Sequence, residues 1–321
     1  MSEARKGEGP VVVLAGGTGG AKLARGMLDV VGADDLVVIA NTGDDIEIYG
    51  AHVSPDPDLV TFWLADRIDE RGWGLAGDTF AVMDGLGGLG ADVWFHLGDR
   101  DLAIGIERAR ALAEGARLTE AQAEIAAALE VRARVLPMSD RPVRTRVLAG
   151  GRWWSLQEFM IVRRCEGPVE DVQLRHVRAA QPSPEVLEAL ATARAIVIGP
   201  SNPIISIGPI LALPGMRDAI RSPGAPVVAV SPLVGGRVLK GPTEAFMRWA
   251  GHPLNSQGIA DAYAEVIDGL VADDPAAQLP VLECDVDLAD PPARRAVAER
   301  TLEFALTLRR SRSCSGATDS L

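Results

Sequence analysis

The fold of this chain is decided by the stretch Val11-Val12-Val13-Leu14-Ala15-Gly16-Gly17-Thr18-Gly19-Gly20-Ala21-Lys22. Its apolar half predicts a buried strand over 11–15, and the apolar spacing after the glycines predicts a helix over 21–31. Glycines without Cβ atoms let backbone N–H groups approach an anion closely, and the first turn of a helix adds unpaired N–H groups and a positive dipole end. The stretch is therefore typical of a strand, a phosphate-binding loop and a helix, although a tight turn without a ligand would use the same residues.

The glycine spacing matches neither of the two common nucleotide-binding fingerprints. The dinucleotide pattern G-x-G-x-x-G requires glycine where Lys22 stands. The P-loop pattern requires glycine at Ala21 and Ser or Thr at Leu23. These mismatches disfavour an NAD-dependent dehydrogenase.

Composition and charge narrow the class of protein. The chain has 321 residues, 47% of them hydrophobic, which is enough for one large domain or two ordinary ones. A formal charge of −12 disfavours nucleic acid and anionic membrane as partners. The three cysteines show no paired spacing, and we find no apolar run as long as a membrane span. We therefore expect a cytoplasmic protein with reduced cysteines.

A second apolar run, 36–40, ends at the polar loop Asn41-Thr42-Gly43-Asp44-Asp45. Together with the first strand and helix it completes a β-α-β unit. A right-handed crossover brings the carboxyl ends of both parallel strands to one edge of the sheet. We therefore expect the glycine loop and this acidic loop to be neighbours.

Further apolar runs at 195–199 and 226–230 predict that the sheet resumes later in the chain. The fold class is therefore α/β, with a Rossmann-like, doubly wound, mostly parallel sheet. We expect a core of 10–100 and 170–308, an inserted helical and hairpin subdomain at 101–169, and flexible tails at 1–9 and 309–321. Other expected strands are 92–97 and 280–284. The expected helices are 61–67, 106–130 with a break near Gly115, 243–250, 257–270 and 291–308.

Aspartates dominate the polar residues at the predicted loop edge: Asp44, Asp45, Asp56, Asp58, Asp99 and Asp101. Carboxylates beside a phosphate loop would repel an anionic ligand unless a divalent cation lies between them. Magnesium fits this arrangement, because it takes oxygen ligands and is usually held by one or two carboxylates together with substrate phosphates. Solvated turns or helix caps are the alternative for any single aspartate.

Polar residues also follow the later strands at the same predicted edge. Ser201 and Asn202 offer donors and acceptors that could bind a base or a phosphate, and a rigid proline turn is the alternative. Lys240 supplies scarce positive charge after the next strand. The four histidines show no metal-ligand spacing and are expected to be structural. No nucleophile motif is present.

Nine motifs, in this order and over nearly the whole chain, resemble one family, the 2-phospho-L-lactate transferases (CofD and FbiA) of coenzyme F-420 biosynthesis. They are LAGGTGGAKLARG, NTGDD, SPDPD, RGWG with GDT, HLGDRDLA, LPMSD, GPSNPIISIGPIL, SPLVGG and LKGP.

This resemblance implies an enzyme that uses a guanosine diphospho three-carbon acid, either lactyl (LPPG) or enolpyruvyl (EPPG). Such an enzyme transfers the phosphoryl-linked acid to the ribityl hydroxyl of the deazaflavin Fo. GMP leaves and a phosphodiester forms. We expect a Mg²⁺-dependent homodimer whose partners are these small molecules.

The resemblance also implies roles for individual residues. The diphosphate would be cradled by Gly16, Gly17, Thr18, Gly19 and Gly20. The other substrate-binding residues would be Asn41, Ser201, Asn202 and Gly208. The candidate metal ligands are Asp44, Asp45, Asp56 and Asp58, and the candidate catalytic residues are Asp45, Asp58, Asp99 and Arg100.

The chain departs from the family pattern at Ile104-Gly105, where the family usually has Thr-His. The alternative function is a nucleotide-sugar-binding regulatory protein of the YvcK type, which shares the fold. That group tends toward a DDGGSSG run, whereas this chain has Asp44-Asp45-Ile46-Glu47.

Overall fold

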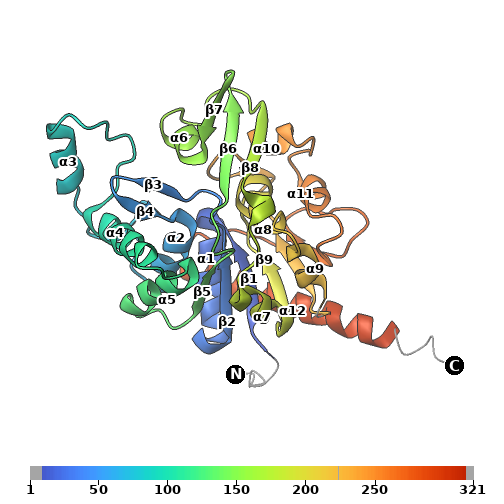
Figure 1. Ribbon diagram of the computed structural model, residues 1–321. Helices are drawn as coiled ribbons and strands as arrows, with labels where there is room; N and C mark the ends of the chain where they lie inside the picture. Colours follow the sequence, from blue (N-terminus) through green and yellow to red (C-terminus); the bar gives the residue numbers. More distant parts are fainter. Residues whose placement is uncertain (1–8, 223, 316–321) are drawn as a thin grey trace.

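A parallel sheet of seven strands forms the centre of the computed structural model, which describes residues 9–222 and 224–315, with side chains as far as 308 (Figure 1). The strand order is β14-β13-β10-β9-β1-β2-β5, and all neighbouring pairs are parallel. This confirms the predicted α/β class and Rossmann-like sheet. The strands are β1 Val11–Ala15, β2 Leu36–Ala40, β5 Arg134–Pro137, β9 Ala195–Ile198, β10 Val227–Val230, β13 Gly269–Ala272 and β14 Val281–Glu283.

The central strand β1 pairs with β2 on one side and with β9 on the other. Helix α1 (Gly17–Val31) carries the chain from β1 to β2. The later strands β9, β10, β13 and β14 occupy the opposite half of the sheet. The carboxyl ends of β1 and β9 therefore lie at the point where the strand order reverses, which is where open α/β sheets bind ligands.

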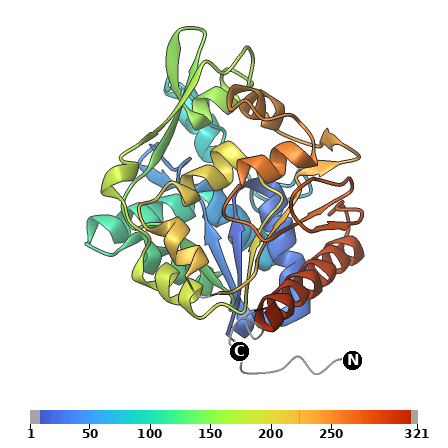
Figure 2. The same cartoon turned by 90° about the vertical axis from the view of Figure 1, so that its right-hand side faces the viewer.

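Helices cover both faces of the sheet (Figures 1 and 2). One apolar cluster contains Val11, Val13 and Ala15 of β1, and the other contains Val12 and Leu14. This alternation explains the continuous apolar run, because both faces of a parallel strand are buried. The first face is covered by α1, α2 (Pro55–Leu64) and α12 (Pro291–Ser315). The second is covered by α7 (Pro184–Ala191), α8 (Gly208–Leu211), α9 (Met216–Arg221), α10 (Thr243–Trp249) and α11 (Ser256–Ala262).

Smaller elements surround the carboxyl edge of the sheet, and the antiparallel strands β6, β7 and β8 rise beyond it in Figure 1. Helix α3 projects at the upper left of the same view. The strands are β3 Ile46–Ile48, β4 Ala51–Val53, β6 Arg144–Ala149, β7 Arg152–Ser155, β8 Asp171–Arg175, β11 Leu233–Val234 and β12 Arg237–Val238. The helices are α3 Ala81–Gly88, α4 Asp99–Ala113, α5 Leu118–Ala128 and α6 Leu156–Ile161, with short helical turns η1 Ala33–Asp35, η2 Val177–Ala179 and η3 Pro203–Ile207. No helix in the described ranges is long and apolar enough to cross a membrane.

Several expected elements differ from the structure. Helices α1 and α4 begin at Gly17 and Asp99, earlier than the expected positions 21 and 106. The expected strand 92–97 is irregular, and α4 begins directly after it, with Asp99 and Asp101 in a first turn where acidic side chains favour the helix dipole. The expected helix 257–270 ends at Ala262, and β13 follows as a buried strand. The helix expected to begin at Thr61 begins at Pro55, because proline fits the first helical position and needs no N–H partner there.

The domain boundaries drawn from sequence also differ. Strand β5 lies inside the expected insertion 101–169, yet it forms the edge of the central sheet by pairing with β2. Strand β8, expected in the core, pairs with β6. Residues 309–315, expected as tail, continue α12, whereas 1–8 and 316–321 lie outside the described residues.

The glycines after β1 allow α1 to pack against the turn that follows β9. A Cβ atom on Gly19 would lie 2.0 Å from the carbonyl oxygen of Pro200, and one on Gly20 would lie 2.7 Å from the Ser201 hydroxyl oxygen. Gly17 adopts a positive φ of 64° at the start of the helix. The glycine loop is therefore required for packing, whatever ligand it binds.

We predict that Gly19→Ala destabilises the protein by about 1–3 kcal/mol, because backbone rather than a flexible side chain blocks the added methyl group. Thermal unfolding measures this. Gly85→Ala is the matched control, since its Cβ would have no neighbour within 4 Å. Equal melting temperatures for the two variants would show that the loop tolerates a shift of the turn after β9.

Candidate active site

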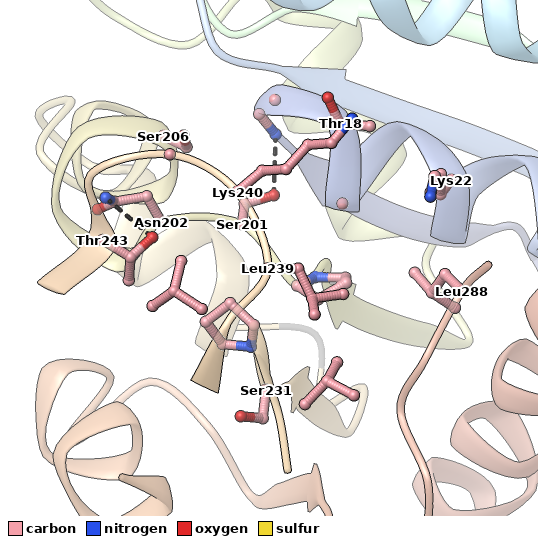
Figure 3. Close-up of a pocket in the computed structure, with 18 of the residues that line it drawn as sticks. Thr18, Lys22, Ser201, Asn202, Ser206, Ser231, Leu239, Lys240, Thr243 and Leu288 are labelled. Atoms are coloured by element: carbon pink, nitrogen blue, oxygen red, sulfur yellow. Dashed lines mark hydrogen bonds between the residues drawn. The ribbon is translucent and has the colours of Figure 1, made fainter. Parts of the chain in front are cut away.

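A pocket of about 410 Å³ lies at the carboxyl edge of the sheet (Figure 3). The glycine loop, residues 16–19, forms one wall. Ser201, which follows β9, and Ser231, which follows β10, line it from neighbouring strands, and Asp287 lines it after β14. The Ser201 hydroxyl accepts a hydrogen bond from the Gly16 N–H at 3.3 Å, so the loop and this turn are held together at the switch point.

Positive charge collects on this pocket. Lys22 lines it one helical turn after Thr18, and Lys240 extends toward the start of α1 in the view of Figure 3. The pKa of Lys22 is lowered first by burial and then by the charges of Arg294 and Lys240. Together with the N–H groups at the start of α1, these cations make the pocket suited to a phosphate or diphosphate.

The predicted substrate-binding residues occupy different positions around this pocket. Thr18 lines it together with Gly16, Gly17 and Gly19. The Asn202 side chain lines it too, but its oxygen accepts the Ile204 and Ile205 N–H groups and so caps the turn η3. Within the described residues, the lining does not include Gly20, Asn41 or Gly208.

The glycine loop and the acidic loop are neighbours, as the β-α-β unit predicts. Asp56, in the first turn of α2, accepts the Gly17 N–H at 2.5 Å and the Asn41 side-chain amide at 2.9 Å. The same amide donates to Asp44 at 3.3 Å. The orientation of the Asn41 amide is fixed because its oxygen accepts a hydrogen bond from the Gly43 N–H at 2.7 Å. Asn41 therefore joins the carboxylates of Asp44 and Asp56.

These carboxylates are poorly solvated. Burial raises the pKa of Asp56 to about 6, with a smaller contribution from Asp45. The pKa of Asp44 is raised well above its ordinary value, first by burial and then by the charges of Asp56 and Asp45. Repulsion of this kind is relieved by a bound cation.

The donor set fits magnesium only with help from a ligand. In the described part of the chain, no group of three or more His, Cys, Asp or Glu residues could hold a metal ion. Two carboxylates completed by phosphate oxygens and water are nevertheless the usual protein share of a Mg²⁺ site. Asp44 and Asp56 form such a pair.

The other two candidate ligands are already engaged with protein groups. Asp45 accepts hydrogen bonds from Ser54 at 2.8 Å and from His52 Nε2 at 3.1 Å. Asp58 forms a bidentate ion pair with Arg108, whose side chain is fully buried. Their carboxylates hold the local structure together, and any metal or proton role for them stays a prediction.

Asp99 and Arg100 lie at the start of α4. Asp99 accepts the N–H groups of Ala81 and Val82, and Arg100 donates to the carbonyl oxygen of Ala76. The linings of the pockets, as far as the described residues show them, do not include either residue. The structure does not bring them to the glycine loop, and their catalytic role remains a prediction.

A smaller pocket of about 160 Å³ adjoins the acidic loop. Asp44 and Asp45 line it opposite Arg144, Arg146 and Gln157, and the Gln157 amide donates to Asp44 at 3.3 Å. Sequence reasoning missed these three residues as site residues. The signal for Arg144 and Arg146 was the alternation along β6, since residues two apart on a strand share a face, whereas Gln157 lies on α6.

Sequence reasoning also missed Lys22. It follows Thr18 by four residues, which places both side chains on one face of a helix. Reading the helix from Gly17 instead of Ala21 would have shown this.

A parallel α/β sheet with a cationic, glycine-lined pocket at its switch point defines a class of proteins that bind nucleotides or phosphorylated ligands. The chain belongs within this class to the family described as 2-phospho-L-lactate transferase CofD, whose family model matches residues 11–296. This confirms the resemblance read from the nine motifs. The protein is a transferase.

Named relatives agree with this family. The chain is 38% identical over 265 residues to the 2-phospho-L-lactate transferase of Methanosarcina mazei, covering 82% of this chain and 87% of that protein. It is 36% identical over 319 residues to the phosphoenolpyruvate transferase of Thermobifida fusca, covering 93% and 98%. The names of these relatives therefore refer to two different three-carbon acids.

A solved structure shares the fold. A UPF0052 family protein from Bacillus halodurans superposes with a TM-score of 0.56 at 18% identity, covering 92% of this chain and 99% of that one. At this identity the likeness concerns the fold alone.

Two aspartates at the start of α4 have opposite electrostatic environments. Burial and the charges of Asp58 and Asp78 raise the pKa of Asp101 to about 7, and its Oδ1 has no hydrogen-bond partner in the described structure. Hydrogen bonds from Thr79, Val82 and Ala81 hold the pKa of Asp99 below its usual value. Ionised Asp101 therefore destabilises the folded protein, whereas ionised Asp99 stabilises it.

We predict that Asp101→Asn stabilises the protein at pH 8. A pKa of about 7 in place of 3.8 corresponds to at most about 4 kcal/mol. The native state binds this proton more tightly than the unfolded chain, so the gain is full above pH 7 and disappears toward pH 4.

Asp99→Asn is the paired variant with the opposite sign. Its lowered pKa means that the loss of stability is full at pH 7 and shrinks as the pH falls below about 4. Melting temperatures of both variants between pH 3 and 8 test the pair. A destabilised Asp101→Asn at pH 8 would contradict the assignment.

Proposed function

We propose that this protein transfers a phospho-lactyl or phospho-enolpyruvyl group from a guanosine diphospho acid to the ribityl hydroxyl of the deazaflavin Fo, releasing GMP, in coenzyme F-420 biosynthesis. The observation that carries the proposal is the pair of sites joined at Asp56. A cationic, glycine-lined pocket lies on one side, and the acidic loop with its own small pocket lies on the other. Two substrates that meet at a diphosphate need this arrangement. The family and the names of the relatives support the same reaction.

The donor would lie in the larger pocket with its diphosphate at the start of α1. N–H groups of the glycine loop and the cations of Lys22 and Lys240 would bind phosphate oxygens. Ser231, after β10, lines the same pocket and would contact the guanosine end of the donor. These contacts explain why an acidic protein can bind a polyanionic donor.

A magnesium ion would be held by Asp44 and Asp56, completed by phosphate oxygens of the donor. When bound, it supplies neutralisation of charge on the transferring phosphoryl group. The protein's own part is to hold these two carboxylates in place, which Asn41 does by donating to both.

The reaction needs little covalent chemistry from the protein. The ribityl oxygen attacks the phosphorus that carries the three-carbon acid, and the bond from that phosphorus to the bridging oxygen breaks. GMP leaves with the bridging oxygen, and the hydroxyl proton goes to a carboxylate. We assign the proton to Asp45, because it lines the smaller pocket, whereas Asp58 is paired with Arg108. Alignment of the two substrates provides most of the rate.

Turnover with defined substrates tests the proposal. Purified protein, Fo, Mg²⁺ and either the lactyl or the enolpyruvyl donor should yield GMP and a phosphodiester of Fo in equal amounts. Chromatography with mass detection measures both products and identifies the preferred acid. Guanosine nucleotide binding without turnover of either donor would favour the regulatory, YvcK-type alternative instead.

Two further measurements accompany this assay. Lys240→Met should raise the donor KM about tenfold, because it removes a phosphate contact, whereas the exposed Arg237→Met should not.

Light scattering on the purified protein tests the proposed homodimer.

We predict that Asp56→Asn lowers Mg²⁺-dependent turnover at least about 100-fold, because the variant loses a charged ligand and one of its two hydrogen-bond acceptors. In the wild type, protons compete with the metal as the pH falls through about 6, the pKa of Asp56. Half-saturating Mg²⁺ should therefore rise between pH 8 and pH 5.5.

The control for this prediction is Asp34→Asn, whose carboxylate is 81% exposed in the short turn η1. It should behave as wild type. Asp45→Asn and Asp58→Asn should each weaken turnover as well. A wild-type Mg²⁺ requirement in Asp56→Asn would remove this residue from the metal site.

A further inference from the structure

Arg108 of α4 is among the largest fully buried side chains of the described structure, and its contacts reach three other elements. Its Nη1 donates to the carbonyl oxygen of His52 at 2.9 Å and to Asp58 at 3.1 Å. Its Nη2 donates to the second Asp58 oxygen and to Gln122 of α5 at 3.2 Å. One guanidinium therefore connects β4, α2, α5 and its own helix.

The buried Arg108–Asp58 ion pair is not the side-chain arrangement that would stabilise the folded state most. The Arg108 Nε has no hydrogen-bond partner among the described residues, so part of the charge is buried without compensation. Apolar side chains of similar volume often stabilise a protein as well as a buried ion pair does. What a bidentate pair supplies in addition is a fixed geometry between the two elements that it joins.

The geometry that Arg108 fixes is the start of α2. Asp58 lies in the same first turn as Asp56, which contacts both the glycine loop and Asn41. A second connection runs from Gln122 to the Thr61 hydroxyl at 2.9 Å, and that hydroxyl donates to a carbonyl of the same turn, at Pro57, at 2.7 Å. The first turn of α2 is therefore held from the side opposite the glycine loop.

A second branch reaches Asp45 through the hairpin of β3 and β4. The carbonyl of His52 accepts from Arg108, and the ring of His52 contacts Asp45 at 3.1 Å. Gly105 lets α4 approach this point, since a Cβ there would lie 3.3 Å from the same carbonyl oxygen. Arg108 itself borders an apolar groove between α4 and α5, not the two pockets of the proposed site.

We propose that Arg108 is a positioning residue for the transfer reaction. It acts through Asp58 and His52 to set where Asp56 and Asp45 stand relative to the glycine loop. The proposal rests on the proposed function for its kinetic consequence. Its structural consequence, the ordering of the first turn of α2, does not depend on that function.

Arg108→Met should lower kcat at least about 30-fold while the affinity for GDP, used as a probe of the larger pocket, changes less than about threefold. The reason is that Arg108 does not line the larger pocket, whereas its loss lets the carboxylates of Asp56 and Asp45 shift. Arg108→Lys keeps the charge but loses the bidentate contact, so its kcat should be intermediate. The matched control is Arg110→Met, also on α4 but paired with Glu107 and Glu114 in solvent, which should behave as wild type.

Hydrogen exchange provides the measurement that needs no substrate. In Arg108→Met, the amides of Gly17 and of the non-proline residues in 55–61 should exchange at least about tenfold faster than in wild type and in Arg110→Met. The double variant Arg108→Met with Asp58→Leu should recover the melting temperature, because no charge is left unpaired, without recovering kcat.

The outcomes separate the two proposals. A wild type that transfers neither acid defeats the proposed function, and hydrogen exchange then decides on Arg108 alone. Unchanged exchange in Arg108→Met overturns the positioning role. So does a kcat within threefold of wild type, or a double variant that regains full turnover. A fall in GDP affinity as large as the fall in kcat would also overturn it, since that would show general damage to the site.

Discussion

The carboxylate of Asp56 accepts one hydrogen bond from the first N–H of α1 and another from the amide of Asn41. These two donors belong to the loops that follow β1 and β2, so a single side chain fixes the distance between the phosphate-binding wall and the acidic wall. The glycines allow the first contact, because a Cβ on Gly16 would lie 3.0 Å from the Asp56 carboxylate. The rest of the site depends on this junction.

The charges of the two walls oppose each other. Lys22 and Lys240 line the larger pocket, Asp44 and Asp45 line the smaller one, and Asp56 lies between the two loops. Without ligand, burial and mutual repulsion make the ionised carboxylates unfavourable. A cation would neutralise the carboxylates, and a diphosphate would neutralise the lysines. Binding of both would then stabilise a site whose unpaired charges destabilise the ligand-free protein.

The local sequence patterns predicted the core strands correctly and some segments outside the central sheet wrongly. The runs 11–15 and 36–40 are strands because five consecutive apolar residues suit a strand buried on both faces. Residues 92–97 have a similar apolar content but lie irregularly beside α3 and α4. Asp58 illustrates the same limit at the site, because its partner Arg108 is fifty positions away in sequence.

The sequence by itself determined the α/β class, the glycine loop, the neighbouring acidic loop and the transferase family. Each of these follows from local patterns or from motifs in a fixed order. Only the tertiary structure decided which carboxylates face the pockets and which are held by buried partners. Those partners, Arg108 for Asp58 and His52 for Asp45, come from separate elements, and no local pattern encodes which side chain will contact a buried carboxylate.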